Sequence, residues 1–373
     1  MPSKHYTLPT FPVECDLWDR LAAETRPIVV YGMGNGADKL FSRLSEYSVT
    51  VSDVFASDGF VRGHSYRGMR VLSFSEVREK YDDFVILLSF ATSRPEVLEM
   101  LGEINEKYEM YIPDMPVAGE AEYFDREFYN THYAELLKAY NSLADGESRD
   151  LFAAAVNYKL TGKMHYLTDC YSSTEELYSL LPCEKIESYI DVGAYNGDTL
   201  RESRRFFPNL KEAIAIEPDP KTYKRLLKYA DTVTDYTLKT VNAAAFDRAG
   251  DGEFQSAGNR NSSICSTASY EHRAASIPLV RVDSLAERCD YIKYDVEGSE
   301  YEALVGSHGL IEGKYPSLLV SLYHRSRDIF SLVNYINESY SGYRLYLRRT
   351  LSVPCWELAL LCLGEQSEGG PDE

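Results

Sequence analysis

The chain has 373 residues, 44% of them hydrophobic, which is enough for two or three domains with buried cores. Its formal net charge of −19 argues against nucleic acid or an anionic membrane as the main partner, because both attract positively charged surfaces. The seven cysteines show no C-x-x-C spacing, the first thirty residues do not resemble a signal peptide, and no apolar run approaches the ~20 residues that span a bilayer. We therefore expect a soluble cytoplasmic protein without a disulfide framework or a zinc site.

The first α/β unit is predicted over residues 27–113, after an irregular N-terminal arm of residues 1–26. Its strands are expected at residues 27–31, 49–53, 70–72, 84–89 and 110–112, and its helices at 37–44, 75–81 and 96–107. This alternation predicts a small parallel sheet. Gly32 and Gly34 follow the first strand and Asp53 ends the second, which loosely matches a dinucleotide site. A tight turn explains the same glycines, and we expect this unit to position an acceptor or to form a homodimer.

Residues 114–187 contain no clear strand and are predicted to form a helical bridge. Apolar residues at helical spacing indicate helices over 134–143 and 148–160. A second α/β unit is predicted over residues 188–363. Residues 364–373 are rich in Gly and Glu, so we expect a disordered tail.

The second unit is predicted to contain seven strands, the last two antiparallel. They are expected at residues 189–191, 213–217, 239–242, 291–295, 318–322, 344–347 and 356–363, with helices that begin near residues 198, 221, 299 and 328. The predicted fold class is therefore α/β, with a seven-stranded Rossmann-like sheet preceded by a smaller Rossmann-like unit.

The most informative segment joins the first strand of the second unit to its helix. Asp191 ends an apolar run, Gly193 and Gly197 follow, and polar residues open the helix. Twenty residues past Gly197 the next strand ends in Glu217, where an acid can accept hydrogen bonds from both hydroxyls of a ribose. Helix capping by Asp191 and an ordinary strand-end acid would explain each residue alone. Two acids in register on adjacent strands favour a nucleoside site.

The charge of this segment distinguishes the candidate nucleosides. A pyrophosphate needs closely spaced glycines and free backbone N–H groups, whereas Asp191 would repel it. An acid there suits the ammonium and sulfonium groups of S-adenosylmethionine. We expect Asp191 to meet the amino-acid part of this cofactor directly or through water, the glycines to make room for it, and Glu217 to bind its ribose. Residues 242–244, at the tip of the third strand, are placed to contact the adenine.

Five segments resemble the FkbM-type S-adenosylmethionine-dependent methyltransferases in order and spacing, over about residues 187–350. They are residues 191–199, 217–219, 262–263, 282–285 and 292–300. The resemblance implies a class I methyltransferase fold and methyl transfer to a hydroxyl oxygen of a sugar or secondary metabolite. Tyr195 stands where the family often has Asn. The expected cofactor-binding residues are Asp191, Gly193, Asn196, Gly197, Asp198, Thr199, Glu217, Pro218, Asp219, Asn242, Ala243 and Ala244.

Methyl transfer to a neutral alcohol requires alignment of donor and acceptor and removal of a proton, so a general base or a metal is useful. The catalytic candidates follow the fourth and fifth strands: Asp295, Glu297 and His324. His324 is interpreted as a general base or as a loop histidine bonded to backbone. Asp295 and Glu297 are interpreted as a base, a metal pair or helix caps. Because the sequence indicates no third ligand, we rank direct base catalysis above a metal and predict none.

The acceptor is expected to contact Asn261, Ser262 and Ser263 in a Gly/Ser-rich loop, together with Arg325. A solvated connection and a cover over the sheet end are the other interpretations of these residues. The predicted function is O-methylation of a small molecule or glycan intermediate. The alternatives are N- or carboxyl-methylation, a non-catalytic nucleotide-sensing scaffold, and an NAD-dependent sugar-modifying enzyme that uses the first unit.

Overall fold

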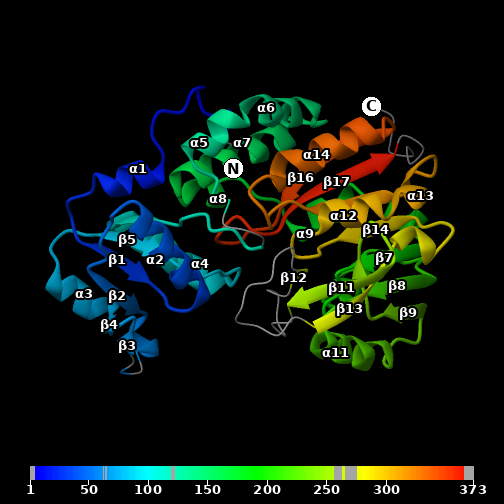
Figure 1. Ribbon diagram of the computed structural model, residues 1–373, viewed down its shortest axis with the longest axis horizontal. Coiled ribbons are helices and arrows are strands. Elements are labelled where there is room, and N and C mark those ends of the chain that lie inside the picture. The colour runs from blue at the N-terminus through cyan, green and yellow to red at the C-terminus, as the bar shows by residue number, and fades with distance from the viewer. Residues whose placement is uncertain are drawn as a thin grey trace.

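The computed structural model describes residues 5–61, 63, 65–118, 122–255, 263–264 and 275–364. Two α/β units lie side by side, and a layer of helices from the middle of the chain covers them at the top of Figure 1. Among the described residues, no helix combines the length and apolar character needed to cross a bilayer.

The first unit is a six-stranded sheet in the order β3-β4-β2-β1-β5-β6, parallel except for β3. Its strands are β1 (Ile28–Tyr31), β2 (Asp53–Ala56), β3 (Ser65–Tyr66), β4 (Met69–Ser73), β5 (Val85–Leu88) and β6 (Glu109–Tyr111). Its helices are α1 (Leu17–Ala22), α2 (Asn35–Glu46), α3 (Phe74–Lys80), α4 (Pro95–Lys107) and the 3₁₀ turn η1 (Asp58–Phe60). Every residue of β1, β2 and β5 is buried, as expected for a parallel sheet covered on both faces.

The second strand of this unit starts at Asp53, four residues later than predicted. The apolar run before Asp53 belongs to the connection, although Val49 and Val51 pack against the core. Asp53 is the first residue of β2, and its carboxylate accepts hydrogen bonds from Lys80 Nζ and Tyr81 Oη. It therefore lies at the edge of the sheet opposite the glycine turn, so the loose dinucleotide pattern predicted for this unit does not form.

The helices of the middle segment join the two units. They are α5 (Arg126–Thr131), α6 (Tyr133–Ser142), α7 (Gly146–Thr161), α8 (His165–Thr168), α9 (Thr174–Ser179) and the 3₁₀ turn η2 (Cys183–Lys185). The predicted helices over 134–143 and 148–160 are present as α6 and α7. Asp145 caps α7 and accepts a hydrogen bond from Arg348 at 2.8 Å, which ties this helix to the second unit.

The second unit is a seven-stranded sheet in the order β16-β17-β15-β14-β7-β8-β9. Its strands are β7 (Ser188–Val192), β8 (Glu212–Ile216), β9 (Thr237–Val241), β14 (Tyr291–Tyr294), β15 (Ser317–Ser321), β16 (Tyr343–Arg349) and β17 (Leu358–Gly364). Only β17 runs against the others, since it pairs antiparallel with both β15 and β16. Because Gly364 ends β17, the predicted tail begins one residue too early; residues 365–373 lie outside the described residues.

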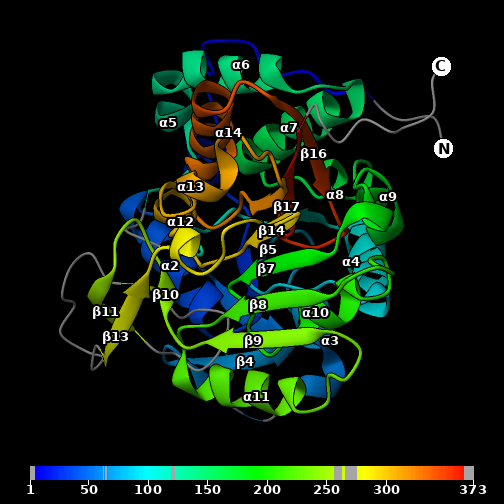
Figure 2. The ribbon, with the colours of Figure 1, turned by 90° about the vertical axis from the view of Figure 1, so that its right-hand side faces the viewer.

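Helices cover both faces of this sheet, and a small second sheet lies beyond the arrowheads of β8 and β9 (Figure 2). The helices are α10 (Asp198–Ser203), α11 (Pro220–Ala230), α12 (Glu300–Val305), α13 (His308–Ile311), α14 (Asp328–Ser339) and the 3₁₀ turn η3 (Val282–Ser284). The small sheet has the order β10-β13-β11-β12, with β10 (Ala244–Ala245), β11 (Gly250–Gln255), β12 (Ser263–Ile264) and β13 (Ala275–Val280).

The first unit touches the second close to the carboxyl edge of the large sheet. Thr92 exchanges two backbone hydrogen bonds with Val353, at 2.7 and 2.9 Å. The carbonyl oxygen of His324 accepts hydrogen bonds from the N–H groups of Val117 and Ala118, at 3.2 and 3.1 Å. The segment that leaves the first unit therefore supports the loop after β15, which bears one of the predicted catalytic residues.

Candidate active site

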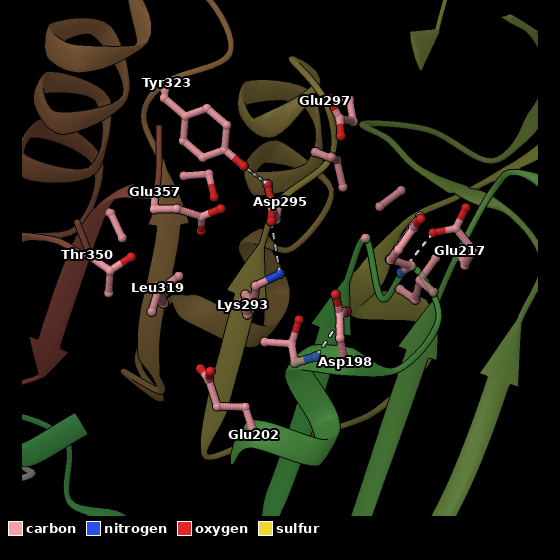
Figure 3. Close-up of a pocket in the computed structure, with 18 of the residues that line it drawn as sticks. Asp198, Glu202, Glu217, Lys293, Asp295, Glu297, Leu319, Tyr323, Thr350 and Glu357 are labelled. Carbon is pink, nitrogen blue, oxygen red and sulfur yellow. Dashed lines mark hydrogen bonds and ion pairs between the residues drawn. The ribbon is translucent and has the colours of Figure 1, made fainter. Parts of the chain in front are cut away.

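A cavity of about 390 Å³ opens at the carboxyl ends of β7, β8 and β14 and continues along one face of the sheet (Figure 3). Of the described residues that line it, six are acids and one is a lysine: Asp198, Glu202, Glu217, Asp295, Glu297, Glu357 and Lys293. Such a lining attracts cationic ligands and repels phosphates and carboxylates.

The turn after β7 forms one wall of the cavity and depends on glycine at two positions. Gly193 has φ +89°, and a Cβ there would lie 1.9 Å from the carbonyl oxygen of Asp295. Gly197 has φ +83°, and its Cβ would lie 2.2 Å from the ring of Tyr229. Glycine thus lets the turn contact the end of β14 directly, which brings the two predicted segments together.

Glu217, at the tip of β8, is fixed by the turn itself. Its Oε2 accepts the N–H of Tyr195 at 2.9 Å and its Oε1 accepts the N–H of Asp219 at 2.8 Å. Burial raises the pKa of Glu217 to about 8, although these two hydrogen bonds oppose the shift. Only 6% of the residue is exposed, yet it lines the cavity. The acid expected to bind a ribose therefore lies beside the glycine turn, as predicted.

Asp191 does not lie where a ligand could contact it. The residue has no exposed surface, and neither carboxylate oxygen makes a hydrogen bond within the described part of the chain. Lys293 Nζ lies 3.7 Å from its Oδ1. Burial raises the pKa of Asp191 to about 6, with the Lys293 charge opposing the shift. The structure therefore does not support direct contact of Asp191 with the cofactor, and contact through water stays a prediction; Asp198 and Glu202, on α10, line the cavity.

The remaining predicted cofactor residues divide into those that line the cavity and those that shape its wall. Gly193, Asp198, Thr199, Glu217, Pro218 and Ala244 line it, and Tyr195 and Ala245 join them. The others do not: Asn196 accepts a hydrogen bond from Arg201, Asn242 Nδ2 donates to the carbonyls of Glu217 and Pro218, Asp219 caps α11, Gly197 packs on Tyr229, and Ala243 is buried. These residues shape the wall of the cavity, and their contact with the cofactor stays a prediction.

Asp295 follows β14 directly and lies between Glu217 on one side of the cavity and Glu357 on the other (Figure 3). Its Oδ1 accepts a hydrogen bond from Tyr323 Oη at 3.1 Å, and its Oδ2 accepts one from Lys293 Nζ at 3.2 Å. Burial would raise the pKa of Asp295, but the charges of Lys293 and His324 outweigh it and lower the pKa to about 2. Asp295 is therefore an ionised carboxylate at neutral pH.

His324 is completely buried behind Asp295 and Glu297. Its Nδ1 lies 2.8 Å from Glu300 Oε1, and its Nε2 lies 3.4 Å from Asp295 Oδ1 and 3.6 Å from Glu297 Oε2. Burial would lower the pKa of His324, but the three carboxylates outweigh it and raise the pKa to about 10. Without a metal ion this arrangement favours the protonated imidazole, which does not act as a base, so the structure does not support His324 as a general base.

Glu297 and Glu300 lie on either side of the start of α12. Glu297 has φ +54°, a left-handed conformation that is uncommon for a residue with a side chain, and Gly298 follows at φ +97°. Ser299 is the N-cap residue of α12, and its side chain makes no hydrogen bond to the helix. Glu300 Oε1 accepts the N–H of Val296 at 2.9 Å as well as contacting His324.

The predicted acceptor-binding residues are mostly outside the described chain. Asn261 and Ser262 are not described, and for Ser263 only the backbone is, as the first residue of β12. Arg325 does not line the cavity; its Nε lies 3.1 Å from the position a Cβ on Gly298 would take. Arg325 therefore packs over the turn before α12, and its predicted contact with an acceptor is not supported.

Several cavity residues were missed from the sequence. Lys293 had a usable signal, because a charge inside a buried strand needs a partner. Glu202 also had one, since it lies four residues after Asp198 on the same helix face. Glu357 and Thr350 come from the connection between β16 and β17, and Ser93 comes from the first unit. No local pattern indicates these last three, because only tertiary packing brings them to the cavity.

Comparison with known proteins agrees with this geometry. Residues 191–347 match the family model of the methyltransferase FkbM domain. No curated protein sequence is similar enough to the chain to count as a match. A crystal structure of methyltransferase FkbM from Methylobacillus flagellatus KT is similar with a TM-score of 0.66 and 20% identity, over 96% of this chain and 94% of that one. At this identity the similarity shows the fold alone, the Rossmann-like α/β sheet of class I methyltransferases.

Two further solved structures share about half of the chain. The precorrin-6y C5,15-methyltransferase from Geobacter metallireducens has a TM-score of 0.32 and 11% identity, with 51% of this chain and 85% of that chain covered. Aeropyrum pernix fibrillarin with bound S-adenosyl-L-methionine has a TM-score of 0.32 and 15% identity, with 51% and 74% covered. These TM-scores are too low to support conclusions about the chain.

Proposed function

We propose that the protein is an S-adenosylmethionine-dependent methyltransferase, since residues 191–347 match the family model of the methyltransferase FkbM domain. The observation that carries this proposal is the position of Glu217 on the cavity wall, where its carboxylate is held by the N–H of Tyr195 in the glycine turn and by the N–H of Asp219. A carboxylate there can accept hydrogen bonds from both ribose hydroxyls. Ala244 and Ala245 add small apolar surface next to it, which suits an adenine ring.

The charge of the cavity favours this donor over a dinucleotide. With Glu217 at the ribose, a donor that extends past Gly193 would bring its sulfonium and methyl group toward Asp295 and Glu297. Asp198 and Glu202 are suited to its ammonium group, and Lys293 to its carboxylate. Opposite charges within about 4 Å attract more strongly in a partly buried cavity than in water, so this lining selects a cationic ligand.

We propose that the acceptor is a hydroxyl of a sugar, a glycan intermediate or a secondary metabolite. The acidic lining disfavours acceptors that carry phosphate or carboxylate, which argues against nucleic acid and against carboxyl methylation. Alignment of donor and acceptor can lower the activation free energy of such transfers by up to about 7–11 kcal/mol. The same acidic lining would also attract a protonated amine, so N-methylation is the second candidate.

Titration calorimetry of the full chain tests the donor. S-adenosylhomocysteine should bind at one site per chain, whereas NAD should not bind measurably. Binding of NAD alone would overturn the proposal and favour an enzyme that uses the first unit. Transfer of a labelled methyl group to a panel of neutral sugars, amines and carboxylic acids then tests the acceptor; methylation of the acids alone would contradict a neutral acceptor.

A further inference from the structure

The ring of His324 is oriented by one carboxylate and aimed at two others. Glu300 Oε1 lies 2.8 Å from Nδ1 and also accepts the N–H of Val296, so both the acid and the ring are fixed. Nε2 is completely buried and makes no hydrogen bond within the described residues. It faces Asp295 Oδ1 at 3.4 Å and Glu297 Oε2 at 3.6 Å. A buried nitrogen without a hydrogen bond requires an explanation, because such atoms are costly.

These distances are close to those of a metal site before the ion enters. Metal–ligand bonds of about 2.0–2.2 Å place neighbouring ligand atoms about 3.0–3.4 Å apart. The two separations from His324 Nε2 are therefore only a few tenths of an ångström from a bound geometry. Glu297 lies outside the group of ligand atoms that are all within 4.8 Å of one another, so its carboxylate must turn toward Asp295 when an ion binds. We propose that His324 Nε2, Asp295 and Glu297 bind a divalent transition-metal ion, with Glu300 as the carboxylate that orients the histidine.

Glu300 is assigned the orienting role because of what its oxygen already contacts. Asp295, Glu300 and His324 each offer an atom within 4.8 Å of the others, so Glu300 could also be considered a ligand. Its Oε1 is held by Nδ1 and by the backbone, which orients the ring and leaves Nε2 for the ion. Glu300 Oε2 is buried and makes no hydrogen bond within the described residues, so an ion that also bound Oε2 would still leave Oε1 in its orienting role. Metal-binding histidines usually donate their other ring nitrogen to a carboxylate in this way. Glu300 was not among the catalytic candidates predicted from the sequence. In this proposal it does not bind the ion but orients the histidine that does.

Mixed imidazole and carboxylate ligands suit Mn²⁺, Fe²⁺, Co²⁺ or Zn²⁺ better than Ca²⁺. Asp295 and Glu297 line the cavity, so the open positions of the ion would face the acceptor (Figure 3). An ion there would bind the acceptor hydroxyl and lower its pKa, with the proton released to water. This role rests on the proposed function, whereas the site itself does not. The competing explanation is a metal-free cluster in which a protonated His324 pairs with the acids.

Binding of Mn²⁺ to the full chain, without any methyl donor, tests the site. The six-line EPR signal of free Mn²⁺ should decrease until one ion is bound per chain after removal of other metals with a chelator. Asp295→Asn and Glu297→Gln should each weaken binding by about 10–100-fold. Glu202→Gln is the matched control, because it removes an acid from the same cavity away from His324, and it should stay within twofold of wild type. Wild-type affinity in Glu297→Gln, or no saturable binding, would overturn the proposal.

The EPR spectrum of the bound ion provides a second readout. Coupling of Mn²⁺ to an imidazole nitrogen is expected in the wild-type chain and should be lost in His324→Gln. If His324→Gln does not fold, the wild-type spectrum still decides, since the absence of nitrogen coupling would contradict ligation by His324. Binding of Mn²⁺ without binding of S-adenosylhomocysteine would support the metal site and overturn the proposed function. Binding of S-adenosylhomocysteine without binding of Mn²⁺ would support the proposed function and overturn the metal site.

Discussion

The two α/β units begin with the same backbone arrangement and differ in what it presents. In the first unit Gly32 donates its N–H to the carbonyl of Phe55, and in the second Gly193 donates to Ile216, both at 3.0 Å. Each turn also includes a glycine too close to the neighbouring strand for a side chain. The position of a Cβ on Gly36 lies 2.2 Å from the Ser89 carbonyl oxygen, which corresponds to the 1.9 Å approach of Gly193 to Asp295.

The side chains at matching strand positions are different. Asp191 is opposite Lys293 in the second unit, whereas the corresponding pair in the first is Val30 and Leu87. All four are buried. The second unit therefore places an ion pair in its sheet where the first has an ordinary apolar contact.

The strand tips differ in the same way. Glu217 follows the last residue of β8, and the corresponding position in the first unit is Ala56, at the end of β2. The cavity beside the first turn is smaller, about 220 Å³, and its described lining includes one charged residue, Lys39, which donates to two backbone carbonyls. The two glycine turns are alike, so the feature that distinguishes the second unit is the acid at the adjacent strand tip.

Replacement of the buried ion pair should have the largest effect. Lys293→Leu gives this position the residue found in the first unit. It removes the cation that faces both Asp191 and Asp295 and leaves Asp191 unpaired, so the free energy of unfolding should fall by about 3–5 kcal/mol. Adding Asp191→Val, which completes the copy, should recover part of the loss. Urea unfolding of the two variants measures this coupling. Stability unchanged in Lys293→Leu would show that the pair does not hold the sheet together.

Replacement of Gly36 or Gly193, the glycines that lie against a neighbouring backbone carbonyl, should lower stability in both units. Only the replacement of Gly193 should also weaken ligand binding. Gly193→Ala and Gly36→Ala should each lower the free energy of unfolding by about 2–4 kcal/mol, because each Cβ meets a backbone oxygen. Only Gly193→Ala should weaken S-adenosylhomocysteine binding, since it displaces the turn that contacts Asp295. Equal loss of affinity in both variants would mean that the first turn also shapes the ligand site.

Glu217→Ala places alanine at the tip of β8, as the first unit has Ala56 at the end of β2. S-adenosylhomocysteine affinity should fall by about 2–4 kcal/mol, because hydrogen bonds from both ribose hydroxyls to a carboxylate are lost. Asp53→Ala is the matched control: it removes an acid from the corresponding strand of the first unit, at the edge away from its glycine turn. Affinity unchanged in Glu217→Ala would remove the basis for a ribose contact.

The acidity of Glu217 should produce a smaller, pH-dependent effect. With a pKa of about 8 raised by burial, Glu217 is mostly protonated at pH 7 in the free chain. If its ionised form binds the ribose best, affinity should rise about tenfold between pH 7 and pH 9, and this rise should be absent in Glu217→Gln. Calorimetry across this range measures it.

The same group should influence stability in the opposite direction. Because the folded pKa of Glu217 is above its ordinary value of 4.5, the folded chain holds a proton that the unfolded chain releases. Its stabilising contribution is complete below pH 4.5 and is lost as the pH rises through about 8. Glu217→Gln should flatten this part of the unfolding profile, and an unchanged slope would contradict the raised pKa.

The sequence predicted the features that depend on local pattern. The alternation of buried strands and helices, the glycine turn after β7 and the acid at the tip of β8 all follow from residues close together in the chain. The boundary of β2 is not predicted correctly. The β-branched run before Asp53 predicts a strand, but the hydrogen-bonded strand starts with Asp53 itself. The pairing of β2 with β1, and not propensity, decides that boundary.

Features that depend on distant residues could not be predicted. Asp191 was expected to face a ligand because nothing local shows that Lys293, about a hundred residues away, lies against it. His324 was interpreted as a base because its partners Glu300 and Asp295 lie on another strand–helix connection. The pKa and the accessible contacts of a buried charged side chain depend on its neighbours in the fold, which a local sequence pattern does not show.

A crystal structure of the chain with S-adenosylhomocysteine tests the central difference between the two turns most directly. We predict that the ribose lies on Glu217, the adenine beside Ala244, and the sulfur points toward Asp295. Ligand density at the turn of Gly32 to Gly36, beside Lys39, with the second cavity unoccupied, would contradict the account.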